Sequence, residues 1–134
     1  TMVLKDKRVL LVEDNELNAE IATEILTREG VNIDRAENGS CCLEALDSRP
    51  ELYYDLILMD IQMPVMNGYE AARAIHRLDN KNAGIPIIAM TANAFKEDID
   101  KCIQAGMNAH LAKPINIDNL ITTMQRVLEN KNDF

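Results

Sequence analysis

The sequence lacks several features that would place it in a specialised class of protein. Its 134 residues contain no tryptophan, 5 glycines and 4 prolines, a composition that excludes a collagen-like or low-complexity chain. Apolar runs are only a few residues long, so the sequence has neither a membrane-spanning helix nor the apolar core of a signal peptide. We therefore expect a cytoplasmic domain that makes no membrane contact of its own, within a parent protein that could be membrane-anchored.

Cysteine and positive charge are also scarce. Of the 3 cysteines, Cys41 and Cys42 are adjacent and Cys102 is far away, which fits neither a disulfide framework nor metal-ligand spacing. We expect free thiols, buried as small hydrophobic groups in a reducing compartment. The 14 basic residues face 22 acidic ones, a net charge of −8. A chain this acidic repels phosphate backbones, so we expect no direct nucleic-acid binding.

The remaining composition is that of an ordinary globular protein, with 47% hydrophobic and 27% charged residues. The length favours one domain over residues 1–134, with a core at about 7–128. Short apolar runs predict strands, and longer segments with helical periodicity alternate with them. The predicted strands are 8–12, 32–36, 56–59, 87–90 and 109–112. The predicted helices are 16–29, a segment that follows the Asn38-Gly39 turn and runs through Leu43 and Leu46 to about Ser48, 69–79, 95–105 and 117–129, with Asn116 as N-cap of the last. In the first of these helices, Ile21, Ala22, Ile25 and Leu26 recur at helical spacing.

Five strand–helix units in regular alternation imply an α/β fold with a parallel sheet and helices on both faces. Right-handed crossovers make this an open, doubly wound sheet. At this length, the flavodoxin-like strand order 2-1-3-4-5 with five helices fits best. In such sheets, ligands bind beyond the carboxyl ends of the strands, at the point where the strand order reverses.

Polar residues follow the predicted strands at that end of the sheet. Glu13 and Asp14 follow the first strand, Asp60 the third, Thr91 the fourth and Lys113 the fifth. Taken singly, such an Asp is often a turn former, Thr91 a helix cap and Lys113 a solvated surface residue. Together, carboxylates, a hydroxyl and an ammonium group beside a hard cation such as Mg²⁺ (or Mn²⁺) form a site suited to phosphoryl transfer.

Four segments at these positions resemble one known family, the receiver domains of two-component response regulators. The segments are VLLVEDNELN, DLILMDIQMPVMNGYEAAR, PIIAMTANA and GMNAHLAKPI, and the resemblance extends from about Lys7 to Leu128. Within them, the motifs VEDNELN, MTANA and HLAKPI are most similar to those in the receivers of hybrid sensor histidine kinases. The resemblance implies the CheY-like version of the predicted fold and a place in a phosphorelay.

The resemblance also implies roles for individual residues. Asp60 corresponds to the phosphoacceptor, and Lys113 to its basic partner. Asp14 corresponds to a direct Mg²⁺ ligand, Glu13 to a ligand acting through water, and the backbone carbonyl of Gln62 to a third protein ligand. The implied function is transfer of a phosphoryl group from a phosphohistidine to Asp60. Apart from its own phosphorylation and dephosphorylation, the domain is not expected to be an enzyme.

Further positions correspond to the switch of this family. Thr91 matches the hydroxyl that contacts the phosphoryl group, and the bond from Lys113 to Pro114 is expected to be cis. Gln62 and Asn93 match two positions that tune loss of the phosphoryl group. His110 departs from the family's usual Tyr or Phe, so it is as readily a solvated edge-strand residue as a switch. His76 is expected at the surface.

Several alternatives remain open at this stage. A receiver-like interaction module that signals without phosphorylation would not need the complete acidic set. A flavodoxin-like cofactor-binding protein would need a hydroxyl-rich phosphate loop where the acidic Glu13-Asp14-Asn15-Glu16 stands, and a dehalogenase-type phosphatase would need an Asp at Gln62. The expected partner is a histidine kinase or a histidine phosphotransfer domain. The resemblance implies a contact surface formed by the fourth helix, fifth strand and fifth helix, through which a homodimer stays open. A stand-alone receiver, part of a hybrid kinase and part of a longer regulator stay open as well.

Overall fold

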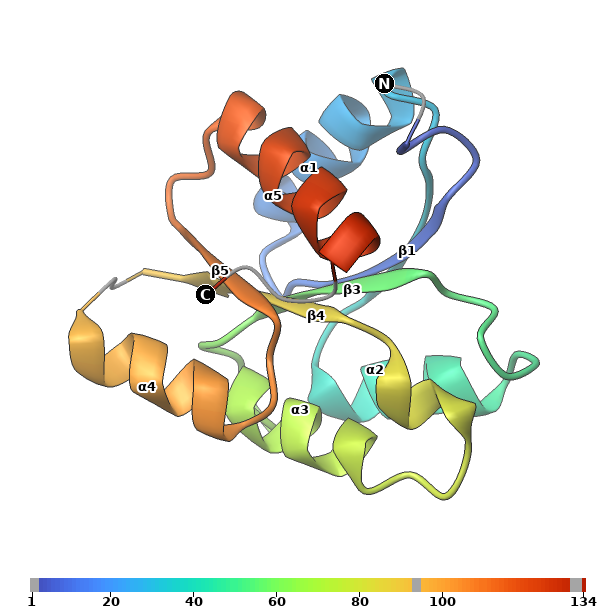
Figure 1. The fold of residues 1–134 in the computed structure, drawn as a ribbon, viewed down its shortest axis with the longest axis vertical. Coiled ribbons are helices and arrows are strands. Elements are labelled where there is room, and N and C mark those ends of the chain that lie inside the picture. The colour runs from blue at the N-terminus through green and yellow to red at the C-terminus, as the bar shows by residue number, and fades with distance from the viewer. Residues whose placement is uncertain (1–2, 93–94, 131–133) are drawn as a thin grey trace.

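Five parallel strands form the centre of the molecule in the order β2-β1-β3-β4-β5, as the sequence predicted (Figure 1). The computed structural model describes residues 3–92, 95–130 and 134. The strands are β1 (Arg8–Val12), β2 (Asn32–Ala36), β3 (Leu56–Asp60), β4 (Ile87–Thr91) and β5 (Ala109–Ala112). The helices are α1 (Glu16–Arg28), α2 (Gly39–Asp47), α3 (Gly68–His76), α4 (Lys96–Gln104) and α5 (Ile117–Asn130), with a short 3₁₀ helix, η1 (Lys81–Gly84).

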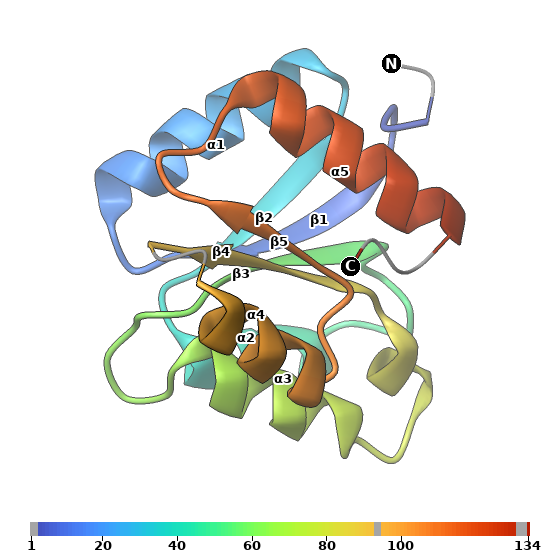
Figure 2. The ribbon, with the colours of Figure 1, turned by 60° about the vertical axis from the view of Figure 1, so that its left-hand side comes forward.

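Helices cover both faces of this sheet. Figures 1 and 2 show α1 and α5 on one face and α2, α3 and α4 on the other. Strands β3 and β4 are buried along their whole length, because each has a neighbour on both sides and helices above and below. Along β1, Leu11 points to the α1 and α5 side, whereas Leu10 and Val12 point to the other side.

The sheet therefore separates two apolar clusters. The cluster beneath α1 and α5 includes Leu26 of α1 with Leu120 and Met124 of α5. The opposite cluster includes Cys42 of α2, Ile75 of α3 and Cys102 of α4. The side chains of all these residues are at most 1% exposed, so each helix is held mainly by burial of its apolar face.

Asparagine side chains begin four of the five helices. The side-chain oxygens of Asn15, Asn38 and Asn67 accept backbone N–H groups in the first turns of α1, α2 and α3, each at 2.9 Å. Asn116 accepts the N–H of Asn119 at 3.0 Å at the start of α5, as the sequence predicted. Helix α4 differs, since Phe95 holds the cap position and makes no side-chain capping bond.

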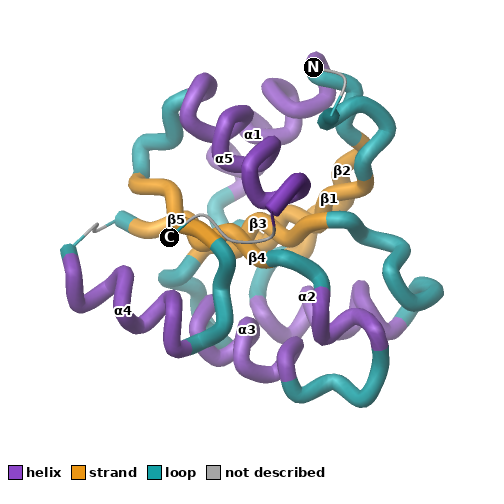
Figure 3. Tube along the Cα trace, in the orientation of Figure 1, coloured by secondary structure: helices purple, strands orange, loops and turns teal. Residues whose placement is uncertain are grey.

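The third helix is shorter than the predicted 69–79. It ends at His76, and the chain then forms η1, which the sequence analysis did not anticipate (Figure 3). Asn80 caps η1, and the buried Asn82 accepts the backbone N–H of Leu52 at 2.8 Å. This long-range bond requires the chain to turn back toward the loop before β3, and helical periodicity cannot reveal such a requirement.

Within the described residues, the helices are too short or too polar to cross a lipid bilayer.

Candidate functional site

Strand register brings the polar residues of the predicted site to one edge of the sheet. Val12 pairs with Met59, so Glu13 and Asp60, the residues that follow them, lie side by side. Asp60 pairs with Met90, the residue before Thr91. Thr91 in turn pairs with Ala112, and its carbonyl accepts the N–H of Lys113 at 2.8 Å. The four strand ends are therefore level, and their side chains share one crevice.

Three carboxylates meet in this crevice. Glu13, Asp14 and Asp60 each place one oxygen within 4.8 Å of the other two. Glu13 is 2% exposed and Asp60 is 3% exposed, whereas Asp14 is open to solvent. No other group of this kind occurs in residues 3–92, 95–130 and 134. Oxygen ligands of this type, at a partly open position, are those that Mg²⁺ and Mn²⁺ accept.

Lys113 is the cation of the cluster. Its Nζ lies 3.0 Å from Oδ1 of Asp60 and 3.2 Å from Oε2 of Glu13. Burial alone lowers the pKa of this ammonium group, but the hydrogen bond and charge of Asp60, together with Glu13, outweigh burial and raise the pKa above its usual value. Lys113 therefore stays charged. As the resemblance implied, the peptide bond that joins Lys113 to Pro114 is cis.

Asp60 has an unusual protonation equilibrium. Burial raises its pKa to about 6, and the neighbouring Glu13 carboxylate adds to the rise, while the hydrogen bond from Lys113 opposes it. One ammonium group thus does not compensate three carboxylates. The cluster is short of positive charge, and a divalent cation would supply it.

The loop between β3 and α3 is held close to Asp60. The N–H of Ile61 donates to the carbonyl of Met90 at 3.1 Å, and the N–H of Gly68 donates to Ile61 at 2.9 Å. A Cβ atom on Gly68 would collide with the carbonyl oxygen of Asp60 and lie 2.9 Å from Cα of Ile61, so only glycine allows this approach. Gln62 is exposed at the start of this loop, beside the crevice.

A residue that the sequence analysis did not single out also reaches the site. Arg35 near the end of β2 donates from its guanidinium group to the backbone carbonyl of Glu13 at 2.9 and 3.1 Å. It also donates to the carbonyl of Asp14 at 3.3 Å. The available signal was weak, because a single arginine in an edge strand is most often a solvated side chain.

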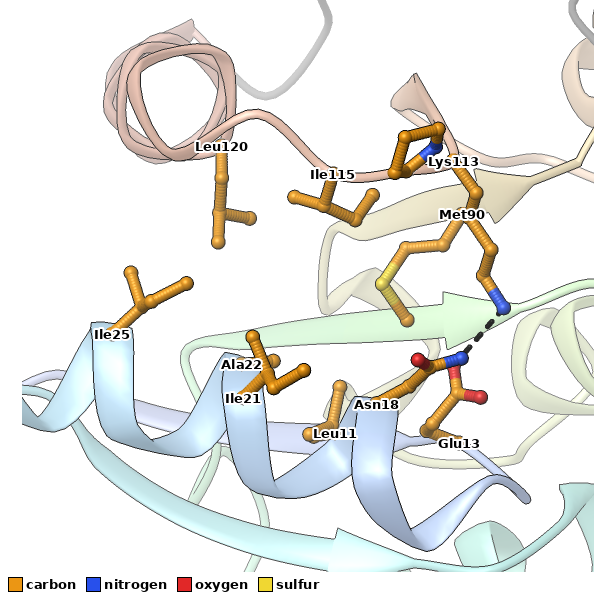
Figure 4. Close-up of a pocket in the computed structure, with 11 residues that line it drawn as sticks. Leu11, Glu13, Asn18, Ile21, Ala22, Ile25, Met90, Lys113, Ile115 and Leu120 are labelled. Atoms are coloured by element: carbon orange, nitrogen blue, oxygen red, sulfur yellow. Dashed lines mark hydrogen bonds and ion pairs between the residues drawn. The ribbon is translucent and has the colours of Figure 1, made fainter.

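An apolar groove of about 470 Å³ opens beside the cluster, between α1 and α5. Figure 4 shows Glu13 and Lys113 at one end of it and Ile25 and Leu120 at the other. Ile21, which helical spacing assigned to the apolar face of α1, is 50% exposed at the groove. The apolar face of α1 is therefore only partly covered by the rest of the domain. The groove is lined by Leu11, Glu13, Asn18, Ile21, Ala22, Ile25, Met90, Lys113, Pro114, Ile115 and Leu120.

The other predicted residues lie away from the carboxylates or outside the described chain. His110 on β5 is half-buried, stacks on the ring of Phe134 at 5.8 Å between centroids, and has a buried Nδ1 without a hydrogen bond. Asn93 lies outside the described residues. His76 is exposed at the end of α3, and its Nε2 donates to the carbonyl of Gly106 at 2.7 Å.

The doubly wound α/β fold, with an acidic cluster and one lysine at its switch point, is shared with a known protein family. The family model for the response regulator receiver domain matches residues 9–125. The chain belongs to this family and is a receiver domain of two-component signalling systems.

Relatives occur both as short regulators and as segments of large kinases. The polar-differentiation response regulator DivK of Brucella anthropi is 40% identical over 91% of this chain and 96% of its own length. The peroxide stress-activated histidine kinase mak1 of Schizosaccharomyces pombe is 37% identical over 92% of this chain. The chain spans 8% of mak1, and 15% of probable histidine kinase 1 of Oryza sativa, which is 34% identical.

Solved receiver structures have the same fold. The receiver domain of sensor histidine kinase PA1611 from Pseudomonas aeruginosa is 37% identical, with a TM-score of 0.83 over 93% of this chain and 99% of that one. That structure is described as having a magnesium ion coordinated in the active site cleft. The chemotaxis protein CheY4 of Vibrio cholerae is 27% identical, with a TM-score of 0.84 over 91% of this chain and 98% of that one.

Proposed function

We propose that this domain accepts a phosphoryl group on Asp60 from a phosphohistidine of a partner protein. The observation that carries the proposal is the buried Asp60 carboxylate, 3.0 Å from the Lys113 ammonium group and within 4.8 Å of two further carboxylates. In this arrangement Asp60 is the nucleophile, and Lys113 and Thr91 act on the oxygens of the incoming phosphoryl group.

The donor set fits a divalent cation. Asp14 and Asp60 would bind it directly, together with the backbone carbonyl of Gln62, and Glu13 would act through water. Three carboxylates against one lysine leave an excess of negative charge that such an ion offsets. A bound Mg²⁺ or Mn²⁺ supplies positive charge to the phosphoryl oxygens during transfer.

The transfer is a displacement at phosphorus. A carboxylate oxygen of Asp60 forms a new P–O bond while the P–N bond to the histidine breaks, and the imidazole leaves with the bonding electron pair. Lys113 lies on the Asp60 carboxylate before transfer and offers its N–H groups to the phosphoryl oxygens during it. Apart from forming and losing this acyl phosphate, the domain is assigned no further catalysis.

The phosphoryl group changes the population of a second surface. The Thr91 hydroxyl, at the carboxyl end of β4, moves toward the new phosphoryl oxygens, and the surface of α4, β5 and α5 follows. His110 lies on β5 within this surface, and Gln62 and Asn93 tune how quickly the phosphoryl group is lost. A homodimer of two receivers would use the same surface.

A histidine kinase or a histidine phosphotransfer domain is the proposed partner. Histidine kinases are among the relatives of this chain. The groove beside Glu13 and Lys113 also offers an apolar surface against which a partner's side chains can pack. Ile21, which lines it, is 50% exposed, and Leu17 of α1 and Ile117 of α5 are also at least 50% exposed on the two helices that border the groove. We place the domain, residues 1–134 with a core at about 7–128, in the cytoplasm.

Phosphoramidate tests the proposal because its P–N bond matches that of phosphohistidine. The protein is incubated with phosphoramidate and Mg²⁺, and its intact mass is measured. We expect one phosphoryl adduct on the wild type, none on Asp60→Asn, and none on the wild type with a chelator. Asp100→Asn, which removes an exposed carboxylate from α4, is the matched control and keeps the adduct. An adduct that survives in Asp60→Asn would refute the assignment, and no adduct on the wild type would favour a receiver that signals without phosphorylation.

A further inference from the structure

The loop that carries the acidic pair is attached to the edge of the sheet by one side chain. Arg35 pairs in register with Leu11, so its side chain emerges on the α1 side of β2. From there, Nε and Nη2 donate to the carbonyl oxygen of Glu13, and Nη2 donates to that of Asp14. The guanidinium group thus spans two consecutive peptide groups of the β1–α1 loop.

These bonds continue the sheet beyond its last strand pair. The ladder between β1 and β2 ends at Val12 and Ala36, and the N–H of Glu13 still reaches the carbonyl of Ala36 at 3.1 Å. The carbonyl of Glu13 lies beyond the last strand pair, and the guanidinium group of Arg35 donates hydrogen bonds to it in place of a strand N–H. A further bond within the loop runs from the N–H of Asn15 to Oε1 of Glu13 at 3.3 Å.

We propose that Arg35 is a positioning residue for the metal site, a role that rests on the function proposed above. The hydrogen bonds of Arg35 to this loop go to backbone carbonyl oxygens and not to the carboxylate oxygens. It fixes the backbone of Glu13 and Asp14, so that their side chains are already directed toward Asp60 when the cation arrives. A loop that is ordered beforehand loses less conformational entropy on binding, and the cation binds more tightly.

The positive charge of Arg35 opposes cation binding, but this effect is weaker than the ordering of the loop. A guanidinium group near the cluster repels a divalent cation, but Arg35 is exposed, so water and salt screen its charge. It also lies among the acidic side chains of α1, and Glu16, Glu20 and Glu24 line the same hollow. Loss of Arg35 should therefore weaken cation binding.

Titration with Mg²⁺ by isothermal calorimetry tests this role. We expect Arg35→Ala to bind Mg²⁺ about tenfold more weakly than the wild type, near the lower end of the effect of losing an outer-shell partner. Arg35→Lys keeps the charge but cannot reach both carbonyls through two nitrogens, so we expect a loss of similar size. Arg28→Ala is the matched control. It removes an exposed arginine that pairs with Glu24 on α1, and it should leave Mg²⁺ affinity unchanged.

Two further measurements separate positioning from a general loss of structure. The metal-free unfolding temperature of Arg35→Ala should stay close to that of Arg28→Ala. With phosphoramidate, Arg35→Ala should need more Mg²⁺ for half-maximal labelling of Asp60 and reach the wild-type rate at saturation. Wild-type Mg²⁺ affinity in Arg35→Ala or in Arg35→Lys would overturn the positioning role of Arg35 and leave the proposed function unaffected. A wild type that binds no Mg²⁺ would refute the proposed function as well.

Discussion

At the scale of single residues, Asp60 shows opposing effects on one carboxyl group. Burial and the Glu13 carboxylate disfavour its charged form, and Lys113 favours it, with a net pKa of about 6. The folded protein therefore holds this proton more tightly than the unfolded chain does. A shift from the ordinary 3.8 to about 6 corresponds to about 3 kcal/mol between the two protonation states.

This imbalance predicts how stability depends on pH. Stability from the protonated Asp60 is complete below the unfolded pKa of about 3.8, and it is lost as the pH rises through about 6. Asp60→Asn has no such titration, so without metal it should be more stable than the wild type at pH 8, by about 1–3 kcal/mol. Urea unfolding in the presence of a chelator, from pH 4 to pH 8, measures the difference.

Asp100→Asn controls for the loss of one negative charge from an acidic protein. Its stability should follow the wild type across the same pH range, since Asp100 is exposed on α4. Equal stability of Asp60→Asn and wild type at pH 8 would contradict the burial effect on Asp60.

At the scale of secondary-structure elements, α4 is the helix with the weakest start. Phe95 occupies its cap position with an extended backbone, φ −73° and ψ 154°, and its side chain offers no acceptor to the first turn. Helices α1, α2 and α3 each have an asparagine there. Because no side chain caps its first turn, the beginning of α4 is the least costly of these helix starts to rearrange.

Phe95→Asn should therefore stabilise the domain by about 1 kcal/mol, because the new side chain can accept an N–H of the first turn. The increase should appear as a higher unfolding temperature. Phe95→Ala is the control for losing a ring that is 69% exposed, and it should lack the increase. An asparagine variant no more stable than the alanine variant would show that the first turn of α4 gains nothing from a side-chain acceptor.

The strands and their order could be predicted because each strand leaves a local apolar signature, and topology then brings the strand ends together. Asp60 and Lys113 are 53 residues apart, yet their contact follows from the strand order alone. The end of α3 at His76 and the bonds of Arg35 could not be predicted, since both depend on long-range contacts of single polar groups. Ile21 had the spacing of a core residue, but the groove that leaves it exposed exists only in three dimensions.

At the scale of the whole molecule, one sheet separates two apolar clusters. Cys42 and Cys102 lie in the cluster beneath α2, α3 and α4, while Cys41 packs at its margin and is partly exposed. Burial raises the pKa of the Cys42 thiol to about 12, and burial also raises that of Cys102. A thiol that stays protonated inside a core reacts only when the structure opens.

The rate of thiol labelling should therefore depend on whether the domain is folded. At pH 8 we expect one thiol per chain to react quickly with a disulfide reagent, and two more to react only as fast as the domain unfolds. Cys41→Ser should remove the fast phase and leave the slow ones. Urea should merge all three into a single fast reaction. Two fast thiols in the native protein would mean that the cluster is not closed around Cys42 and Cys102.

The bond between His76 and Gly106 determines how α4 can change its position. It ties the C-terminal end of α4 to α3, whereas the N-terminal end of α4 has no capping side chain. A helix that is held at its C-terminal end rotates about that end and does not translate along its axis. Any displacement that begins near Thr91 would swing the first turn of α4 through a wide arc and leave its last turn almost stationary.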